Sequence, residues 1–137
     1  MSEQRPIVVA RPAFAGIGRV CLAWDGGKEA TRAARKAVPL LRKAKRVVIV
    51  GAPDASSRSF DQARLQAFLA ARGVKAEAQV LQGSADAGHL LLEAARGASA
   101  DILVAGAFGH TRLREYIFGG TTRTLLNSDG PTLFLSH

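Results

Sequence analysis

The chain is poor in the residues that build disulfides, metal centres and aromatic nucleic-acid surfaces. Cys21 is its only cysteine, which excludes an internal disulfide and suits a reducing cytoplasm. His89 and His137 have no histidine or cysteine partner at metal-ligand spacing, so no metal site is expected. Aromatic residues make up only 6% of the chain. The net charge of +8 therefore does not by itself predict nucleic-acid binding, which usually interleaves aromatic residues with basic ones.

Long apolar runs and catalytic nucleotide motifs are also lacking. No apolar stretch approaches the roughly 18 residues needed to cross a bilayer, so no membrane association is expected. The first residues, MSEQRPIVVARP, are too polar for a secretory signal. No Gly-Lys-Ser/Thr sequence and no evident aspartate pair for magnesium are present. A slow ATPase or phosphotransferase is thus the least favoured class, and catalysis is not expected beyond weak ATP hydrolysis.

Short apolar runs alternate with segments of helical periodicity along the chain. Strands are predicted at 19–24, 46–52, 74–81, 102–105 and 132–135, and helices at 28–41, 59–72, 85–96 and 121–127. A capping box of Ser59 and Gln62 is expected to start the second helix, and Gly73 and Gly97 to end the second and third. Such alternation predicts an α/β domain with a parallel sheet and helices on both faces.

A short apolar segment bracketed by prolines, Pro6 to Pro12, precedes this pattern. It is expected to form a brief strand at an edge of the sheet. We therefore divide the chain into an N-terminal arm with a short strand, residues 1–18, and a main domain, residues 19–137.

The stretch from Asp101 to Pro131 has the features of an anion site. A strand ends at Gly106, and glycines follow at 109, 119 and 120 before a predicted helix. Glycines let backbone N–H groups approach an oxyanion, and a helix N-terminus adds unpaired donors. The same glycines could instead serve only a tight loop with positive φ.

The glycine spacing in this strand–loop–helix setting resembles the universal stress protein family. The first strand and helix, RVCLAWDGGKEATRAARKAVPLL, are similar to the start of that family, including Asp25 at the strand end. The resemblance covers about residues 19 to 137. It implies a Rossmann-like, adenine nucleotide α-hydrolase-like fold with an open five-stranded parallel sheet, and a homodimer formed through the C-terminal strand.

The resemblance also implies a site for ATP or another adenine nucleotide, with Mg²⁺ as a possible companion. The strand-one aspartate would lie near the adenosine, backbone groups after strand two near the adenine, and the glycine loop around ribose and phosphates. The implied binding residues are Asp25, Ala52, Gly106, Gly109, Gly119, Gly120 and Thr121. We add Thr122, whose hydroxyl could bond a phosphate, and His110, which lies in the same loop and could face an anion or only solvent. No residue is assigned a catalytic role.

Two positions depart from the family pattern. Gly27 stands where the first loop often has serine, and Gly120 stands where serine or threonine usually follows the last glycine of the loop. Each glycine removes a hydroxyl that could bond a phosphate. Two functions follow: a stress-response module that binds an adenine nucleotide without turning it over, or a dimerisation and interaction module that has lost the nucleotide and acts through a protein partner.

Two residues and one segment keep alternatives open. Asp25 could bind the nucleoside, cap the first helix, or do both. Trp24 could contact a base, although core packing is the commoner role. The segment from Pro6 to Pro12 also resembles the final strand of a preceding domain in tandem members of the family, and it could equally be a plain N-terminal arm.

Overall fold

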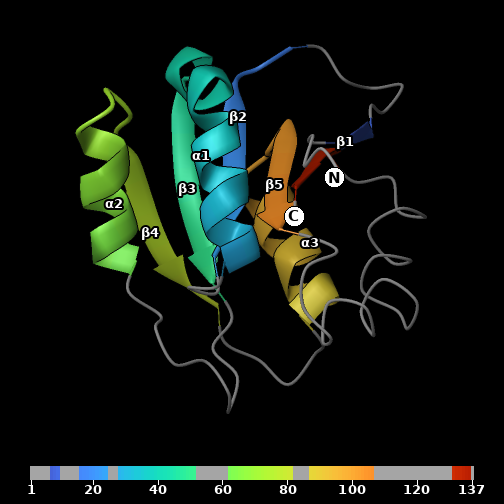
Figure 1. The fold of residues 1–137 in the computed structure, drawn as a ribbon. Coiled ribbons are helices and arrows are strands. Elements are labelled where there is room, and N and C mark those ends of the chain that lie inside the picture. Colours follow the sequence, from blue (N-terminus) through green and yellow to red (C-terminus); the bar gives the residue numbers. More distant parts are fainter. Residues whose placement is uncertain are drawn as a thin grey trace, which may run out of the picture.

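The computed structural model describes residues 7–9, 16–24, 28–51, 62–81, 87–106 and 131–136. Its elements are, in chain order, β1 (Ile7–Val9), β2 (Arg19–Ala23), α1 (Lys28–Lys43), β3 (Arg46–Gly51), α2 (Gln62–Ala70), β4 (Ala76–Val80), α3 (Ala87–Gly97), β5 (Ile102–Gly106) and β6 (Thr132–Ser136). This order confirms the predicted alternation of strands and helices (Figure 1). The helix predicted at 121–127 lies outside the described residues.

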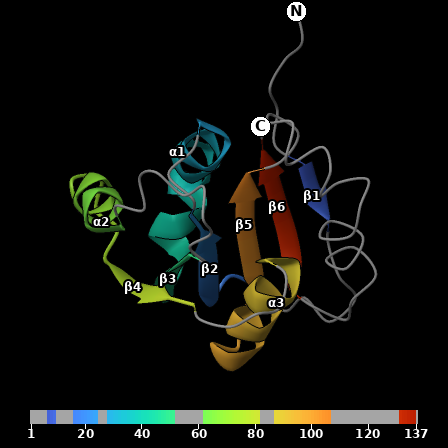
Figure 2. The ribbon, with the colours of Figure 1, turned by 90° about the horizontal axis from the view of Figure 1, so that it is seen from below.

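The described strands form one six-stranded sheet in the order β1-β6-β5-β2-β3-β4. The five strands from β6 to β4 are mutually parallel, and β1 pairs antiparallel to β6. The helices cover both faces: α1 and α2 lie on one side of the sheet and α3 on the other (Figure 2). The predicted fold class is therefore confirmed, including the short extra strand at the edge.

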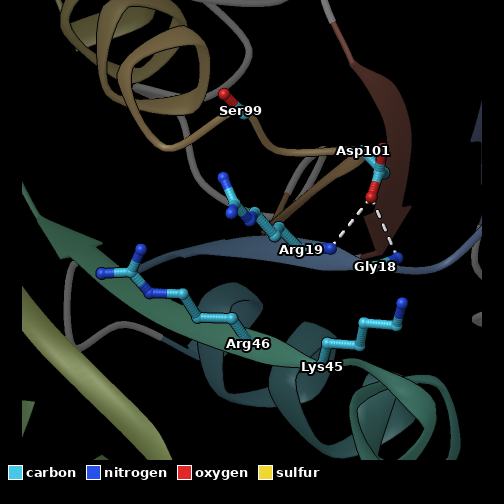
Figure 3. Close-up of a pocket in the computed structure, with 6 residues that line it drawn as sticks. All are labelled: Gly18, Arg19, Lys45, Arg46, Ser99 and Asp101. Carbon is cyan, nitrogen blue, oxygen red and sulfur yellow. Dashed lines mark hydrogen bonds between the residues drawn. The ribbon is translucent and has the colours of Figure 1, made fainter.

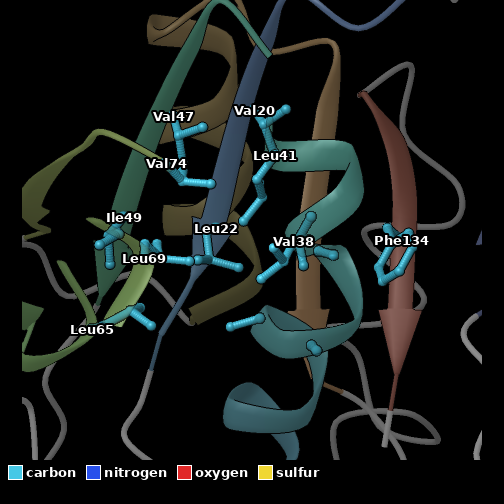
Figure 4. Packing of buried hydrophobic residues seen from close by; sticks show 14 of the residues in the cluster. Val20, Leu22, Val38, Leu41, Val47, Ile49, Leu65, Leu69, Val74 and Phe134 are labelled. Atoms are coloured by element: carbon cyan, nitrogen blue, oxygen red, sulfur yellow. The ribbon is translucent and has the colours of Figure 1, made fainter. Parts of the chain in front are cut away.

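Alternate residues of the central strands supply two separate apolar layers. On β2, Val20 and Leu22 pack towards α1 and α2, whereas Cys21 packs towards α3. The same alternation runs through β3, β5 and β6, and Figure 4 shows the first of these layers. Continuous apolar runs are required here because both faces of a parallel sheet are covered.

Small residues on α1 let that helix approach the sheet closely. Ala33 and Ala37 are fully buried against it, together with Leu41 near the helix end. The helix continues to Lys43 although Pro39 lies inside it and cannot donate a backbone hydrogen bond. Burial of Leu41 in the core accounts for this, because tertiary packing outweighs the local cost of the proline.

Gln62 begins α2 and makes a contact that its sequence pattern did not predict. Its side chain is buried, and its Nε2 donates to the carbonyl oxygen of Gln79 at 2.9 Å. The side-chain amide therefore ties the start of α2 to the edge strand β4. The predicted capping partner, Ser59, lies outside the described residues.

The end of α2 is closed by the glycine predicted to end it. Gly73 has φ +80°, and its N–H donates to the carbonyl of Ala70 at 3.0 Å. The N–H of Val74 reaches back to Leu69 at 2.9 Å, which completes a Schellman motif. No atom lies within 4 Å of where a Cβ at residue 73 would be, so the positive φ is what favours glycine here.

The end of α3 has the same hydrogen bonds with a different residue at the turning point. The helix ends at Gly97 as predicted, but the left-handed residue is Ser99, with φ 52°. The N–H of Ser99 donates to Arg96 at 3.0 Å, and that of Ala100 donates to Ala95 at 2.8 Å. The motif is therefore shifted two residues past the expected glycine, and a side chain occupies the strained position.

The left-handed residues at the ends of α2 and α3 can be tested by a matched pair of substitutions. Ser99→Gly is expected to stabilise the protein by about 0.5 kcal/mol, because relief of left-handed strain exceeds the added entropy of the unfolded chain. Gly73→Ala is expected to destabilise it by about 1 kcal/mol for the opposite reason. Urea denaturation of both variants measures these changes. A shift of both variants in the same direction would contradict the assignment.

Cys21 is the thiol in the second apolar layer. It is free and fully buried, and burial raises the pKa of its thiol to about 11, with the charge of Arg46 opposing the shift. The ordinary value is 9.0. The thiol therefore stays protonated in the folded protein at neutral pH, which agrees with its expected role as an inert packing group.

Because the pKa of Cys21 is raised in the folded state, the free energy of unfolding is expected to fall at alkaline pH. The unfolded thiol ionises near pH 9, and the folded thiol only near pH 11. The contribution of the protonated Cys21 thiol to the free energy of unfolding is therefore complete below pH 9 and is lost between pH 9 and 11. The stability difference between wild type and Cys21→Ala should shrink over that interval by about 2–3 kcal/mol. Denaturation curves of both proteins at several pH values test this, and parallel stability profiles would contradict it.

Candidate functional site

The sheet has a topological switch point between β2 and β5. From β2 the chain moves outward to β3 and β4, and it then returns to β5 on the other side of β2. In open parallel sheets, ligands bind beyond the carboxyl ends of the strands where the strand order reverses in this way. The candidate site is therefore the edge of the sheet formed by the carboxyl ends of β3, β2, β5 and β6, which we call the switch edge.

One predicted binding residue lies among the described residues at this edge. Gly106 is the last residue of β5 and pairs with Ser136 at the end of β6. The other predicted binding residues lie outside the described residues: Asp25, Ala52, Gly109, His110, Gly119, Gly120, Thr121 and Thr122. Asp25 follows Trp24 and Ala52 follows Gly51, so both are joined in the chain to strands that neighbour each other at the switch edge.

The switch edge carries two buried polar atoms that have no hydrogen-bond partner among the described residues. They are Nε1 of Trp24, just beyond β2, and Oγ of Ser136. A third such atom, Nζ of Lys36, lies in the middle of α1. Buried polar groups are nearly always hydrogen-bonded, so each of these atoms is an exception that needs an explanation.

Sequence reasoning did not single out Ser136. It took Thr132 to Leu135 as a plain apolar strand, whereas β6 extends through Ser136, which is 1% exposed. The signal that could have found it is the period of two along the strand. Phe134 packs towards α1 and α2, so Ser136 points to the same face.

A hollow of about 530 Å³ lies at the opposite, amino-terminal edge of the sheet. It is lined by Gly18, Arg19, Lys45, Arg46, Ser99 and Asp101 (Figure 3). Three cations and one carboxylate suggest an anion site at first sight. The contacts of these residues with one another favour a structural junction instead.

Most of the polar groups around this hollow bond to the protein. One carboxylate oxygen of Asp101 accepts hydrogen bonds from the backbone N–H groups of Gly18 and Arg19, each at 2.9 Å. Arg46 forms an ion pair with Glu77 at 2.8 Å. The hydrogen bond from Arg46 and its charge lower the pKa of Glu77. The hollow therefore marks where β2, β3 and β5 start, and we place the functional site at the switch edge.

Metal and membrane features are not found in the described part of the chain. No group of three or more histidine, cysteine, aspartate or glutamate side chains that could hold a metal occurs in the residues searched. None of the described helices has the length and apolar character needed to span a membrane.

Comparison with known proteins relates this arrangement to one family. The model of the universal stress protein family matches residues 16–133. A universal stress protein crystallised with cAMP is 20% identical, with a TM-score of 0.64, over 90% of this chain and 99% of that one. A universal stress protein from Archaeoglobus fulgidus in complex with dAMP is 16% identical, with a TM-score of 0.60, over 90% and 99% of the two chains.

A second Archaeoglobus fulgidus universal stress protein differs in length. It is 17% identical with a TM-score of 0.73, and the match covers 98% of this chain but only 50% of the other. No curated protein matches the chain by sequence. At these identities, the solved structures establish a shared fold.

Asp101 provides a test of the junction at the amino-terminal edge. Asp101→Ala should destabilise the protein by about 2 kcal/mol, because two backbone N–H groups lose a charged acceptor. Asp101→Asn, which keeps an oxygen acceptor without the charge, should cost less. Urea denaturation measures both, and an alanine variant as stable as wild type would show that the junction is not held by this carboxylate.

Proposed function

Because the chain belongs to the universal stress protein family, we propose that it is a regulatory module that binds an adenine nucleotide at the switch edge without turning it over. The observation that carries this proposal is the position of the switch point, which presents Trp24, Gly51 and Gly106 on three adjacent strands. The structural neighbours in complex with cAMP and dAMP support an adenine nucleotide as the ligand class.

The chemistry of this edge suits a ligand that carries oxygen acceptors. Figure 1 shows that α1 begins at the edge where the parallel strands end, so the positive end of its dipole faces the site. The glycine loop that follows β5 would add backbone donors there. In this proposal Asp25 binds the nucleoside, and the loop from Gly106 to Thr122 binds ribose and phosphates.

A second function is favoured by the two glycines at positions where the family often has a hydroxyl, Gly27 and Gly120. In that case the chain acts as an interaction module without nucleotide. This function includes the homodimer that is expected to form through the C-terminal strand. In the structure β1 pairs with β6 on the outer edge of that strand, so such a dimer needs β1 to move or to carry the contact itself.

Nucleotide titration separates the two functions. Calorimetry with AMP, cAMP and ATP, the last with and without Mg²⁺, should give saturable binding to the wild type. A ligand present at a hundred times its Kd should also raise the stability by about 2.7 kcal/mol. Asp25→Ala should weaken binding at least about tenfold, a loss of about 1.4 kcal/mol. Asp101→Asn, at the far edge of the sheet, should bind like wild type.

The opposite result favours the interaction module. Absence of heat and of thermal shift at millimolar nucleotide would overturn the proposed binding. Gain of ATP binding on Gly120→Ser would then identify the missing hydroxyl as the cause. Hydrolysis that persists in Asp25→Ala would be assigned to a contaminant.

A further inference from the structure

Trp24, Gly106 and Ser136 lie in a row across three neighbouring strands. Gly106 and Ser136 are paired in the register of β5 with β6. Leu22 is paired with Val104, so Trp24 and Gly106, each two residues further along, reach the same level. Each of these three positions is two residues beyond Leu22, Val104 or Phe134, which face α1 and α2. Because strand residues two apart lie on the same face of a sheet, the three positions face α1 and α2 as well. The row thus crosses the switch edge on one face of the sheet.

The two ends of the row carry unsatisfied polar atoms, and its centre lacks a side chain. Oγ of Ser136 is buried in a residue that is 1% exposed, and Nε1 of Trp24 is also buried. Neither atom has a hydrogen-bond partner among the described residues. Gly106 between them has no Cβ that would project towards α1. An indole donor and a hydroxyl therefore lie on either side of a residue that has no side chain.

The charge of the surroundings indicates what these groups would bind. On this face of the sheet α1 lies over β5 and β6, and its N-terminus points to the switch edge (Figures 1 and 2). An indole N–H can only donate, so its partner must be an acceptor. A helix N-terminus favours negative charge. Phosphate oxygens meet both conditions, and sugar oxygens meet the first.

We propose that Trp24 and Ser136 donate hydrogen bonds to oxygen atoms of the sugar-phosphate half of the bound nucleotide, from either side of Gly106. This inference rests on the proposed nucleotide-binding function and adds two residues to the site that the glycine motif does not contain. It also accounts for the orphan atoms, because burial without a partner is unfavourable in the free protein and is relieved when the ligand binds.

The test compares the stability of the free protein with its affinity for AMP. Ser136→Ala and Trp24→Phe each remove one donor and keep most of the side-chain volume. Each should weaken AMP binding about fivefold, the loss expected for one hydrogen bond. Ser136→Ala should leave the melting temperature of the free protein unchanged or higher, because a hydroxyl without a partner stabilises nothing. Ser99→Ala, which removes an exposed hydroxyl at the other edge, should bind AMP like wild type.

The remaining outcomes are distinct. If wild type binds AMP and both variants bind it with unchanged affinity, the inference is overturned while the proposed function stands. A lower melting temperature for Ser136→Ala with unchanged affinity also overturns it, since the hydroxyl would then have a partner in the protein. If wild type binds no nucleotide at all, the proposed function fails and the inference fails with it.

Discussion

The parallel pairing of β2 with β5 is the constraint on which the rest of the structure depends. It joins the first and fourth strands of the parallel sheet, so the chain must leave β2 in one direction and return on its other side. Right-handed crossovers then place α1 and α3 on opposite faces. In open parallel sheets, ligands bind beyond the carboxyl ends of the two strands at such a switch point. The position of the candidate site and the architecture of the fold therefore follow from the same strand pairing.

The two edges of the sheet differ in how their polar groups are used. At the amino-terminal edge, Asp101 binds the start of β2 and Arg46 binds Glu77, so the polar groups mainly hold strands together. At the switch edge, Trp24 and Ser136 keep buried polar atoms without partners in the described chain. The polar groups around the hollow are thus largely accounted for by contacts within the protein, whereas these two atoms are not.

Elements of the fold could be predicted from sequence where one signal dominated. Continuous β-branched runs such as Arg46 to Gly51 are typical of strands buried on both faces, and β3 occupies that range. The turning point of α3 could not be predicted, because Gly97 is the intrinsically favoured residue while packing places the left-handed conformation at Ser99. At the candidate site, the glycine motif predicted Gly106 as a binding residue, and the structure describes it as the last residue of β5. Ser136 could not be singled out from the sequence, because its pairing with Gly106 and its burial are defined only by the assembled sheet.

Trp24 has a spectroscopic consequence. It is the only tryptophan in the chain, and its indole nitrogen is buried at the switch edge. The tryptophan fluorescence of the protein therefore comes from one place, just beyond the end of β2. The emission of an indole depends on the polarity and hydrogen bonding around it, so the protein contains an intrinsic optical reporter of changes at the end of β2.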